Sequence, residues 1–305
     1  MNPKVNIILA TYNGERYIKE QLDSICNQTY SNIDIYIRDD GSSDNTLSVI
    51  KDYQKRCTKK IYILDNDGIN LKCPGSFYEI IKQCKPADYY ALCDQDDIWY
   101  KEKIRWAVER LEKEEKRIPL VYYTACDYST VDGKIIRKSP VQREDLKLYN
   151  VLYYTPGSGF TMVFNERARE DFILNVEPGP ELHDRWLARC AVCFGKLIYD
   201  RRCSASHIRH EEAVTSGDAG NISLISNFIK RELCGADTKY EKKALGYFRN
   251  TFDEKLTDDQ IKTLELFCEK NNIIRWFRKV FYGKRLRARL SGEIALRILF
   301  FIGKI

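Results

Sequence analysis

Three carboxylates follow one apolar run in the first half of the chain. Residues 89–93 read Tyr-Tyr-Ala-Leu-Cys, and Asp94, Asp96 and Asp97 come directly after them. Such a run is typical of a buried parallel strand, and the ligands of open α/β sheets gather at the carboxyl ends of these strands. Crowded carboxylates repel one another unless a cation lies among them, and a divalent cation bound by oxygens is the usual solution. The cluster therefore predicts a site for a metal ion and a diphosphate. A helix N-cap formed by Asp96 or Asp97 is the alternative.

Other acidic positions and one histidine extend this set. Asp39 and Asp40 end a second apolar run, Asp184 follows a Pro-Gly-Pro loop, and His210 lies further along the chain. In such a set one carboxylate can read a nucleotide base, one can hold a metal ion on a diphosphate, and one can act as a general base. For Asp184 the alternative is a helix cap, and for His210 it is a loop histidine that binds nothing.

The elements that must position these residues alternate over the first 125 residues. Segments rich in β-branched and aromatic residues are separated by segments with helical apolar spacing, such as Ile18, Leu22 and Ile25. This alternation predicts right-handed βαβ units and a parallel sheet. No Gly-x-Gly-x-x-Gly opens the first helix and no Walker-type loop is present, which disfavours an NAD-type fold. The predicted strands are 5–10, 33–38, 60–64, 89–93 and 120–124, and the predicted helices are 15–27, about 47–53, 77–84 and 101–116.

The pattern changes after residue 124. Asp132-Gly133 predicts a tight hairpin. Residues 159–164 and 196–199 predict further strands, with a short helix at 166–174 between them and another helix starting near His183. From residue 222 onward the sequence favours helices alone.

The charge is unevenly distributed. Of 305 residues, 50 are Lys or Arg and 44 are Asp or Glu, a net charge of +6. Residues 271–305 hold nine of the basic residues and one acidic residue, Glu293, which leaves 41 basic and 43 acidic residues in 1–270. A nucleic-acid enzyme would carry positive charge around its cleft, so no nucleic-acid partner is expected. No apolar stretch reaches the roughly 20 residues that span a bilayer. Without an export signal, the 11 scattered cysteines indicate a reduced, cytoplasmic protein.

Five stretches of this chain resemble the motifs of family 2 glycosyltransferases with the GT-A fold. The matching stretches are 7–14, 21–30, 39–46, 93–99 and 183–186. The resemblance covers about residues 4–215, and the ordered series is more specific than any one stretch. The forms Asp-Gln-Asp-Asp and His-Asp-x-Trp look most like a bacterial rhamnosyltransferase branch that builds surface polysaccharides such as capsule and O-antigen.

The resemblance implies an α/β fold of the GT-A type. This is a Rossmann-like, mostly parallel central sheet with helices on both faces, followed here by a helical C-terminal extension. The implied catalytic domain is 1–220, with a nucleotide-sugar-binding half at 1–125 and an acceptor half at 126–220. The helical region is then 221–305.

It also implies roles for the donor-side residues. The Tyr12 ring would hold a pyrimidine, although a core position for Tyr12 is the alternative, and Asp40 would bond the ring N–H of the base. Asp39 would support its turn. Asp96 would bind Mn²⁺ or Mg²⁺, with His210 as a second contact, and Asp97 would cap the next helix. The residues implied to bind the nucleotide or donor sugar are Ala10, Thr11, Tyr12, Asn13, Glu15, Asp40, Asp94, Gln95 and Asp96.

On the acceptor side, Asp184 matches the base that deprotonates the acceptor hydroxyl, so that displacement inverts the anomeric carbon. Gly159, Arg185 and Trp186 would lie near the acceptor, and His183 would orient the loop. The implied activity is transfer of L-rhamnose from dTDP-rhamnose to a saccharide or lipid-linked saccharide. The alternatives are a UDP-hexose donor, or a nucleotide-sugar-binding, membrane-associated assembly protein without catalysis.

Two departures from the family pattern affect the specificity that we expect. After the third strand, relatives usually carry a small residue and a second amide where Lys72 and Ser76 stand here. Contacts from this loop to the diphosphate or sugar therefore cannot be carried over. Arg185 stands where an aromatic residue is common, which bears on acceptor choice.

The basic tail, residues 271–305, mixes aromatic and aliphatic residues with cations. This composition predicts a cationic interfacial helix at the inner membrane surface. The alternative is a helix that packs its apolar stripe on the catalytic domain or on a second copy in a homodimer.

Overall fold

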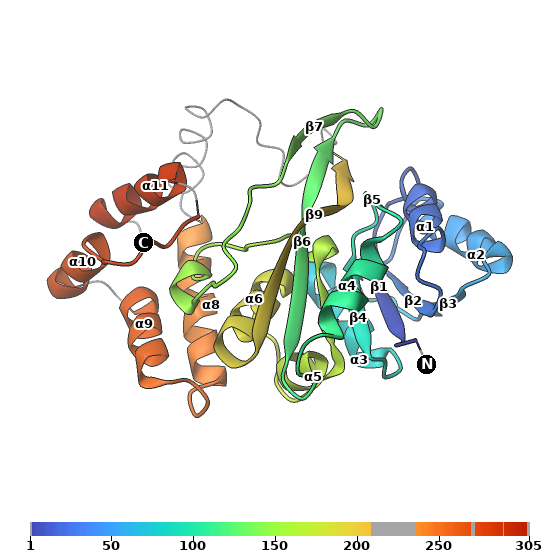
Figure 1. Ribbon diagram of the computed structural model, residues 1–305. Helices are drawn as coiled ribbons and strands as arrows, with labels where there is room; N and C mark the ends of the chain where they lie inside the picture. The colour runs from blue at the N-terminus through green and yellow to red at the C-terminus, as the bar shows by residue number, and fades with distance from the viewer. Residues whose placement is uncertain (1, 209–235, 270–271, 289, 304–305) are drawn as a thin grey trace. The chain divides into compact units, whose positions relative to one another are not determined.

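The computed structural model describes residues 2–208, 236–269, 272–288 and 290–303 (Figure 1). Its largest element is a nine-stranded sheet in the order β3-β2-β1-β4-β8-β6-β9-β5, with β7 paired to β6. The pairs β1–β2, β2–β3, β1–β4 and β6–β9 are parallel, whereas β8 runs antiparallel to both β4 and β6. The expected α/β class is confirmed, with a sheet that is mixed beyond its first four strands.

The early strands lie where the sequence predicts them, to within a residue. β6 and β9 are longer than predicted, because each pairs with the other along most of its length. The strand expected at 159–164 begins instead with a 3-10 turn, η2 (Gly159–Thr161). The strands are β1 (Val5–Thr11), β2 (Ile33–Asp39), β3 (Lys60–Leu64), β4 (Tyr89–Cys93), β5 (Asp97–Trp99), β6 (Leu120–Ser129), β7 (Ile135–Lys138), β8 (Val163–Asn165) and β9 (Lys196–Ile208). The predicted Asp-Gly hairpin joins β6 to β7, and Gly133 supplies the positive φ of 80° that the turn requires.

Helices pack on the sheet through residues that alternate along the strands. On β1, Val5, Ile7 and Leu9 share one apolar core with the buried faces of α1 and α4. Ile8 points to the opposite face, which α3 covers. The helices of this part are α1 (Ile18–Cys26), α2 (Thr46–Arg56), α3 (Lys72–Gln83), α4 (Lys103–Leu111), α5 (Glu166–Arg169), η3 (Glu170–Leu174) and α6 (His183–Phe194).

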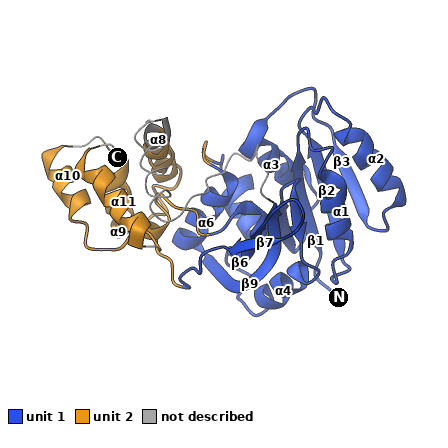
Figure 2. Ribbon diagram, turned by 90° about the horizontal axis from the view of Figure 1, so that it is seen from above, with its two compact units in different colours: residues 1–144, 157–178, 182–210 blue, residues 145–156, 179–181, 211–305 orange. Residues whose placement is uncertain are grey.

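The chain divides into two compact units (Figure 2). Unit 1 comprises residues 1–144, 157–178 and 182–210, and unit 2 comprises residues 145–156, 179–181 and 211–305. The expected boundary near residue 220 falls outside the described residues and stays a prediction.

The regular elements of unit 2 that the structure describes are all helices. Tyr153, from the segment between β7 and β8, packs its ring 5.9 Å from Phe267 and 6.0 Å from Phe300. Asn150 donates to the Arg285 carbonyl at 2.8 Å, so this early segment is held by the C-terminal helices. The helices are η1 (Leu148–Asn150), α8 (Ala236–Thr251), α9 (Asp258–Cys268), α10 (Ile273–Val280) and α11 (Leu290–Phe301). In the described part of the chain, no helix has the length and apolar character needed to cross a membrane.

Candidate active site

The carboxyl ends of three parallel strands bring the predicted donor residues to one edge of the sheet. β1 ends at Thr11, which is in register with Asp39 at the end of β2, and Leu9 of β1 is in register with Cys93 at the end of β4. The Asp40 amide donates to the Thr11 carbonyl at 2.8 Å. The loops that start at residues 11, 40 and 94 therefore leave the sheet side by side.

Gln95 fixes the first of these loops. Its Oε1 accepts from Thr11 Oγ1 at 2.7 Å and from the Tyr12 amide at 2.9 Å, while its Nε2 donates to the Tyr12 carbonyl at 3.1 Å. A Cβ on Gly14 would lie 2.3 Å from Gln95 Oε1, so a side chain there would displace Gln95. The Tyr12 ring is 49% exposed, which excludes a core position and leaves its face open to a planar ligand.

Asn13 and Glu15 join this loop to the one after β2. The Asn13 amide donates to Ser42 Oγ at 2.8 Å, and Asn13 Oδ1 accepts from the Ser43 amide at 2.8 Å. Glu15 accepts from Asn45 Nδ2 at 2.9 Å. These two side chains are thus engaged with the neighbouring loop.

The second loop also contains Asp39, which accepts from the Ser42 amide at 2.9 Å and from the Ser42 hydroxyl. The expectation that Asp39 supports the turn is confirmed.

Asp40 is buried and anchors a third loop, residues 66–72. Its carboxylate accepts from the Leu71 amide at 3.0 Å and the Lys72 amide at 2.6 Å, and it forms an ion pair with Arg38. Arg38 is itself buried and donates to the Ile69 carbonyl at 2.8 Å. Lys72 has a φ of 56°, a conformation that favours glycine, which explains why a small residue suits this position.

Sequence reasoning missed Arg38. A charged residue inside an apolar strand must be paired when it is buried, and this signal was present in the run Ile35-Tyr36-Ile37-Arg38. What the sequence could not reveal is that its partners are Asp40, two residues on, and a carbonyl of the loop after β3.

The predicted metal cluster gathers with the predicted base. Burial raises the pKa of Asp94 well above its ordinary value, and the negative charges of Asp97, Asp96 and Asp184 raise it further. Asp94, Asp96 and Asp184 are each partly exposed. Among the described residues, no protein group donates a hydrogen bond to the side chain of Asp94 or of Asp96. These carboxylates repel one another, and no described cation forms an ion pair with Asp94 or Asp96, so the pair favours a bound cation.

Asp97 has a different role from its neighbours. It is fully buried in β5, and its Oδ1 lies 2.7 Å from His207 Nδ1 on the paired strand β9. Burial raises the pKa of Asp97 to about 6 despite the opposing effect of His207. The prediction that Asp97 caps the next helix is wrong, because α4 begins only at Lys103.

His207 was not predicted as a site residue. Its ring stacks on Phe160 at 5.5 Å, within η2. Its pairing with Asp97 follows from the antiparallel register of β5 and β9, which no local sequence pattern indicates.

Buried packing positions Asp184 at the start of α6. The ring of His183 stacks on Phe77 at 4.0 Å, and its Nδ1 lies 3.8 Å from Cys73 Sγ. Burial lowers the pKa of His183, although Asp184 opposes this, and the ring serves packing through its stack on Phe77. A Cβ on Gly159 would lie 2.5 Å from His183 Nε2, so Gly159 permits this close approach.

Trp186 supports the same helix from within the core. Its side chain is fully buried, and its Nε1 donates to the Phe172 carbonyl at 2.8 Å. Arg185 is half-buried. Asp184 accepts from the Arg185 amide at 2.7 Å, while the N-cap position belongs to Leu182, so Asp184 is not the cap residue.

The carboxylate set is compatible with a metal ion that a ligand helps to hold. Within the described ranges, no three His, Cys, Asp or Glu side chains form a ready-made metal cage. Mg²⁺ and similar ions are often bound by one or two carboxylates together with substrate phosphates. The partly exposed Asp96 and Asp94 fit that mode. His210, predicted as a second metal contact, lies outside the described residues.

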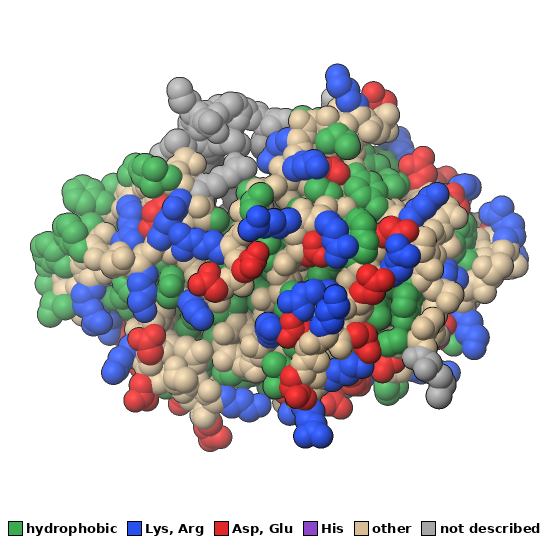
Figure 3. All heavy atoms as spheres, in the orientation of Figure 1, with side chains coloured by type: hydrophobic (Ala, Val, Ile, Leu, Met, Phe, Trp, Pro, Cys, Tyr) green, Lys and Arg blue, Asp and Glu red, His purple; other side chains and the backbone are tan. Residues whose placement is uncertain are grey.

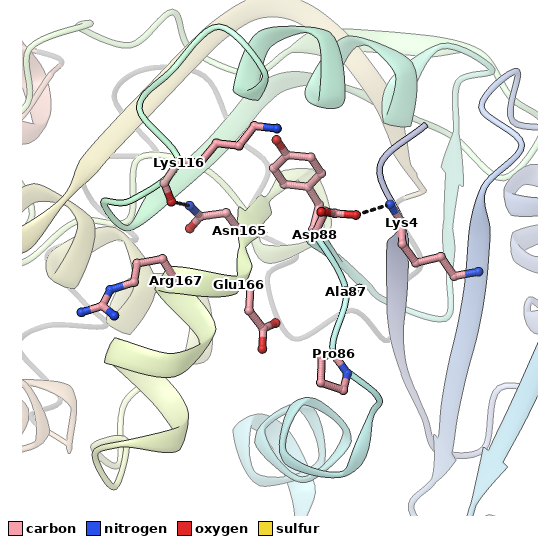
Figure 4. Close-up of a pocket in the computed structure, with 9 residues that line it drawn as sticks. Lys4, Pro86, Ala87, Asp88, Lys116, Asn165, Glu166 and Arg167 are labelled. Carbon is pink, nitrogen blue, oxygen red and sulfur yellow. Dashed lines mark hydrogen bonds between the residues drawn. The ribbon is translucent and has the colours of Figure 1, made fainter. Parts of the chain in front are cut away.

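A separate pocket of about 440 Å³ opens at the opposite edge of the sheet (Figure 4). It lies at the amino ends of β1 and β4, where the Lys4 amide donates to Asp88 at 2.6 Å. Its charged side chains are paired, as in Lys4–Asp34 at 2.7 Å and Lys116–Glu112 at 2.7 Å. This pocket therefore has no part in the acidic site.

Comparisons with known proteins agree on one family. The profile of the family described as "Glycosyl transferase family 2" matches residues 6–168. The chain is 32% identical over 270 residues to the dTDP-rhamnosyl transferase RfbG of Shigella flexneri. The aligned region covers 83% of this chain and 88% of the relative.

Solved structures share the fold. The structure of S. aureus TarS 1–349 in complex with UDP-GlcNAc matches with a TM-score of 0.58 and 17% identity, over 99% of this chain and 81% of that one. The mannosyltransferase PcManGT from Pyrobaculum calidifontis, in complex with GDP-Man and Mn²⁺, matches with a TM-score of 0.55 and 13% identity, over 100% of this chain and 86% of that one. These neighbours confirm the expected GT-A type of fold.

Proposed function

The chain belongs to glycosyl transferase family 2 and is therefore a glycosyltransferase that uses a nucleotide-sugar, and we propose that its donor is dTDP-rhamnose. The acceptor in this proposal is a saccharide, free or lipid-linked, in the synthesis of a bacterial surface polysaccharide. The observation that carries the proposal is that Asp96 and Asp184 lie close enough to Asp94, which directly follows β4, for their charges to act on it. The similarity to RfbG over most of the chain supports the choice of rhamnose and dTDP.

On the donor side, the exposed Tyr12 ring provides a face for the thymine base, and Gln95 holds the loop that carries it. Asp40 lies beside this loop and holds residues 66–72 through the Lys72 amide, and in this proposal its carboxylate accepts from the ring N–H of the base. The rigid hydrogen bonding of these loops favours binding, because few groups must be ordered when the donor arrives.

On the diphosphate, Mn²⁺ or Mg²⁺ held by Asp96 would act as a Lewis acid that stabilises the charge of the leaving dTDP. The Mn²⁺ in the complex of the mannosyltransferase neighbour supports this choice of ion. Asp94 directly follows the last residue of β4, and in this proposal it meets the ribose or the sugar.

Asp184 is the proposed general base. It is partly exposed on the first turn of α6 and close enough to Asp94 for their charges to interact, which supports a place for it beside the donor. A carboxylate there can take the proton of an acceptor hydroxyl as the oxygen attacks the anomeric carbon from the face opposite the leaving group. This attack inverts the configuration of that carbon. His183 and Trp186 hold the helix that carries Asp184.

The test replaces the base and leaves the donor site intact. In Asp184→Asn, consumption of dTDP-rhamnose should fall by about 10²–10⁴-fold, the range typical of a lost general base. The thermal shift caused by dTDP with Mn²⁺ should remain. Asp132→Asn, which changes an exposed carboxylate in the β6–β7 turn, is the matched control and should behave as wild type.

Thermal shifts with dTDP, UDP and GDP, each with Mn²⁺, separate the donor alternatives. A larger thermal shift with UDP than with dTDP would indicate a UDP-hexose donor in place of dTDP-rhamnose. A wild-type protein that binds a nucleotide but consumes none of the donors would instead be a non-catalytic assembly protein.

A further inference from the structure

Helices α10 and α11 of unit 2 expose large apolar side chains that a water-soluble surface would normally bury. On α10 and just after it, Ile273, Ile274, Phe277 and Phe281 are 69%, 66%, 51% and 74% exposed. Their spacing of one, four and eight residues places them on one side of the helix. The rings of Phe277 and Phe281 stack at 6.2 Å, so the stripe is continuous.

Helix α11 is apolar on two sides. One side is buried in the core of unit 2 through Leu296, Leu299 and Phe300. The other side presents Leu290, Ile294, Ile298 and Phe301 at 64%, 52%, 41% and 63% exposed. A surface helix of a soluble domain usually turns a polar side to water, and α11 does not.

The indole of Trp276 joins the two stripes. Its ring lies 4.8 Å from Phe277 and 5.6 Å from Phe301, and its Nε1 donates to the Phe301 carbonyl at 2.9 Å. The exposed apolar residues of the two helices therefore form one surface, here called the α10–α11 face. Figure 3 shows hydrophobic side chains gathered over these helices.

Cations border this face. Arg278 and Lys284 are exposed, and Arg278 shares with Phe277 and Phe281 the lining of a shallow hollow of about 400 Å³. In the sequence, residues 271–305 carry nine Lys or Arg and one Glu. That acid, Glu293, is buried and paired with Arg297. Arg275 is paired with Glu269 and Lys279 is buried, whereas the exposed Arg278 and Lys284 form no ion pair with a described residue. The face therefore combines apolar anchors with these two unpaired cations.

Charge decides between the two surfaces that could cover the face. A second copy would bring a second set of these cations against the first, and like charges oppose such an interface. An anionic leaflet attracts them instead, and its acyl boundary accepts the aromatic and aliphatic side chains. We propose that the α10–α11 face inserts into the headgroup region of an anionic bilayer and attaches the enzyme to it. The biological use of this attachment, access to a lipid-linked acceptor, rests on the proposed function, but the attachment itself does not.

The experiment measures partition of the full-length protein onto vesicles, without donor or acceptor, so that its outcome is independent of catalysis. Wild type should co-sediment with vesicles of phosphatidylcholine and phosphatidylglycerol, and much less with phosphatidylcholine alone. Phe277→Ser with Phe281→Ser should lower the partition coefficient by about tenfold or more, because two inserted rings are lost. Arg278→Glu with Lys284→Glu should remove most of the preference for anionic vesicles, at roughly fivefold per charge.

The matched control is Val131→Ser with Ile136→Ser, two residues of the β6–β7 hairpin that are 70% and 47% exposed. This control should bind as wild type. Sedimentation velocity of each protein identifies the competing occupant. The proposal would be overturned if wild type did not bind anionic vesicles and formed a dimer, while the Phe277/Phe281 variant was a monomer. Equal loss of vesicle binding in the control would also overturn it, since the α10–α11 face would then have no special role.

Discussion

Two groups of carboxylates lie at the same edge of the sheet and differ in how the protein treats them. Asp39, Asp40 and Asp44, at the end of β2 and in the loop after it, accept hydrogen bonds from backbone amides, hydroxyl groups or a buried arginine. Hydrogen bonds from Thr46 and Glu15 outweigh burial and lower the pKa of Asp44. Asp94 and Asp96, after β4, receive no such donors from the described residues, and burial and mutual repulsion raise the pKa of Asp94.

This difference indicates that the first group of carboxylates holds loops in place and that the second group binds a ligand. Satisfied carboxylates lock loops in place, as Asp40 does for residues 66–72. Carboxylates left without donors destabilise the unliganded fold, and a ligand that supplies positive charge recovers that free energy. Substitutions in the two groups should therefore have opposite effects on stability.

Asp96→Asn is expected to have the largest effect. It should lower turnover by about a thousandfold, because a Lewis acid contributes several kcal/mol to such a reaction. The thermal shift caused by Mn²⁺ should disappear, while the metal-free protein should melt slightly higher as repulsion is relieved. Calorimetry with and without Mn²⁺ measures both effects. A metal-free variant that is less stable than wild type would show that Asp96 belongs with the satisfied group.

Arg38→Met tests the satisfied group. The change leaves the buried Asp40 without its cation, and loss of one partner from a buried pair costs about 3 kcal/mol or more. The free energy of unfolding in urea measures this cost, and Arg56→Met, on the exposed end of α2, is the control. A cost below about 1 kcal/mol, the scale of a surface pair, would mean that the two amides alone satisfy Asp40.

Gly14→Ala should have a smaller effect, confined to donor binding. The new methyl group would displace Gln95, which lies 2.3 Å away, and free the Tyr12 loop. The affinity for dTDP with Mn²⁺ should fall by roughly tenfold, on the scale of 1–3 kcal/mol for overpacking. Gly246→Ala in α8, where a Cβ meets nothing, is the matched control and should leave affinity unchanged. Equal affinities of the two variants for dTDP would show that Gln95 does not contribute to donor binding.

The smallest effect should come from a buried cation in unit 2. Burial, assisted by the charge of Lys242, lowers the pKa of Lys279 to about 8 from an ordinary 10.5, although Cys268 opposes this. Between these values the unfolded chain binds the proton that the folded chain releases, so this residue's contribution makes the protein more stable as pH rises from 8 to 10. The free energy of unfolding, measured at pH 8 and at pH 10, should increase between these values more in wild type than in Lys279→Met. An equal rise would show that Lys279 does not titrate in this range.

Local pattern was enough to predict much of the first half of the fold. Apolar runs bounded by turn residues located β1 to β4, and the Asp-Gly pair located the β6–β7 hairpin. The turn role of Asp39 also follows from local sequence, because Ser42 lies only three residues away. By contrast, β6 and β9 together extend fourteen residues beyond the predicted strands. This extension depends on pairing between distant segments of the chain.

The sequence by itself determined which residue types stand at the sheet edge, because strand ends, turns and carboxylates are encoded within a few neighbouring residues. Only the tertiary structure decided what each one does. Gln95 holds a loop 83 residues away in the chain, and Asp97 meets His207 across 110 residues. Arg38 neutralises Asp40, while Asp94 stays beside other acids. A carboxylate's role is set by the donors and charges that surround it, and folding brings those from parts of the chain that no local pattern connects.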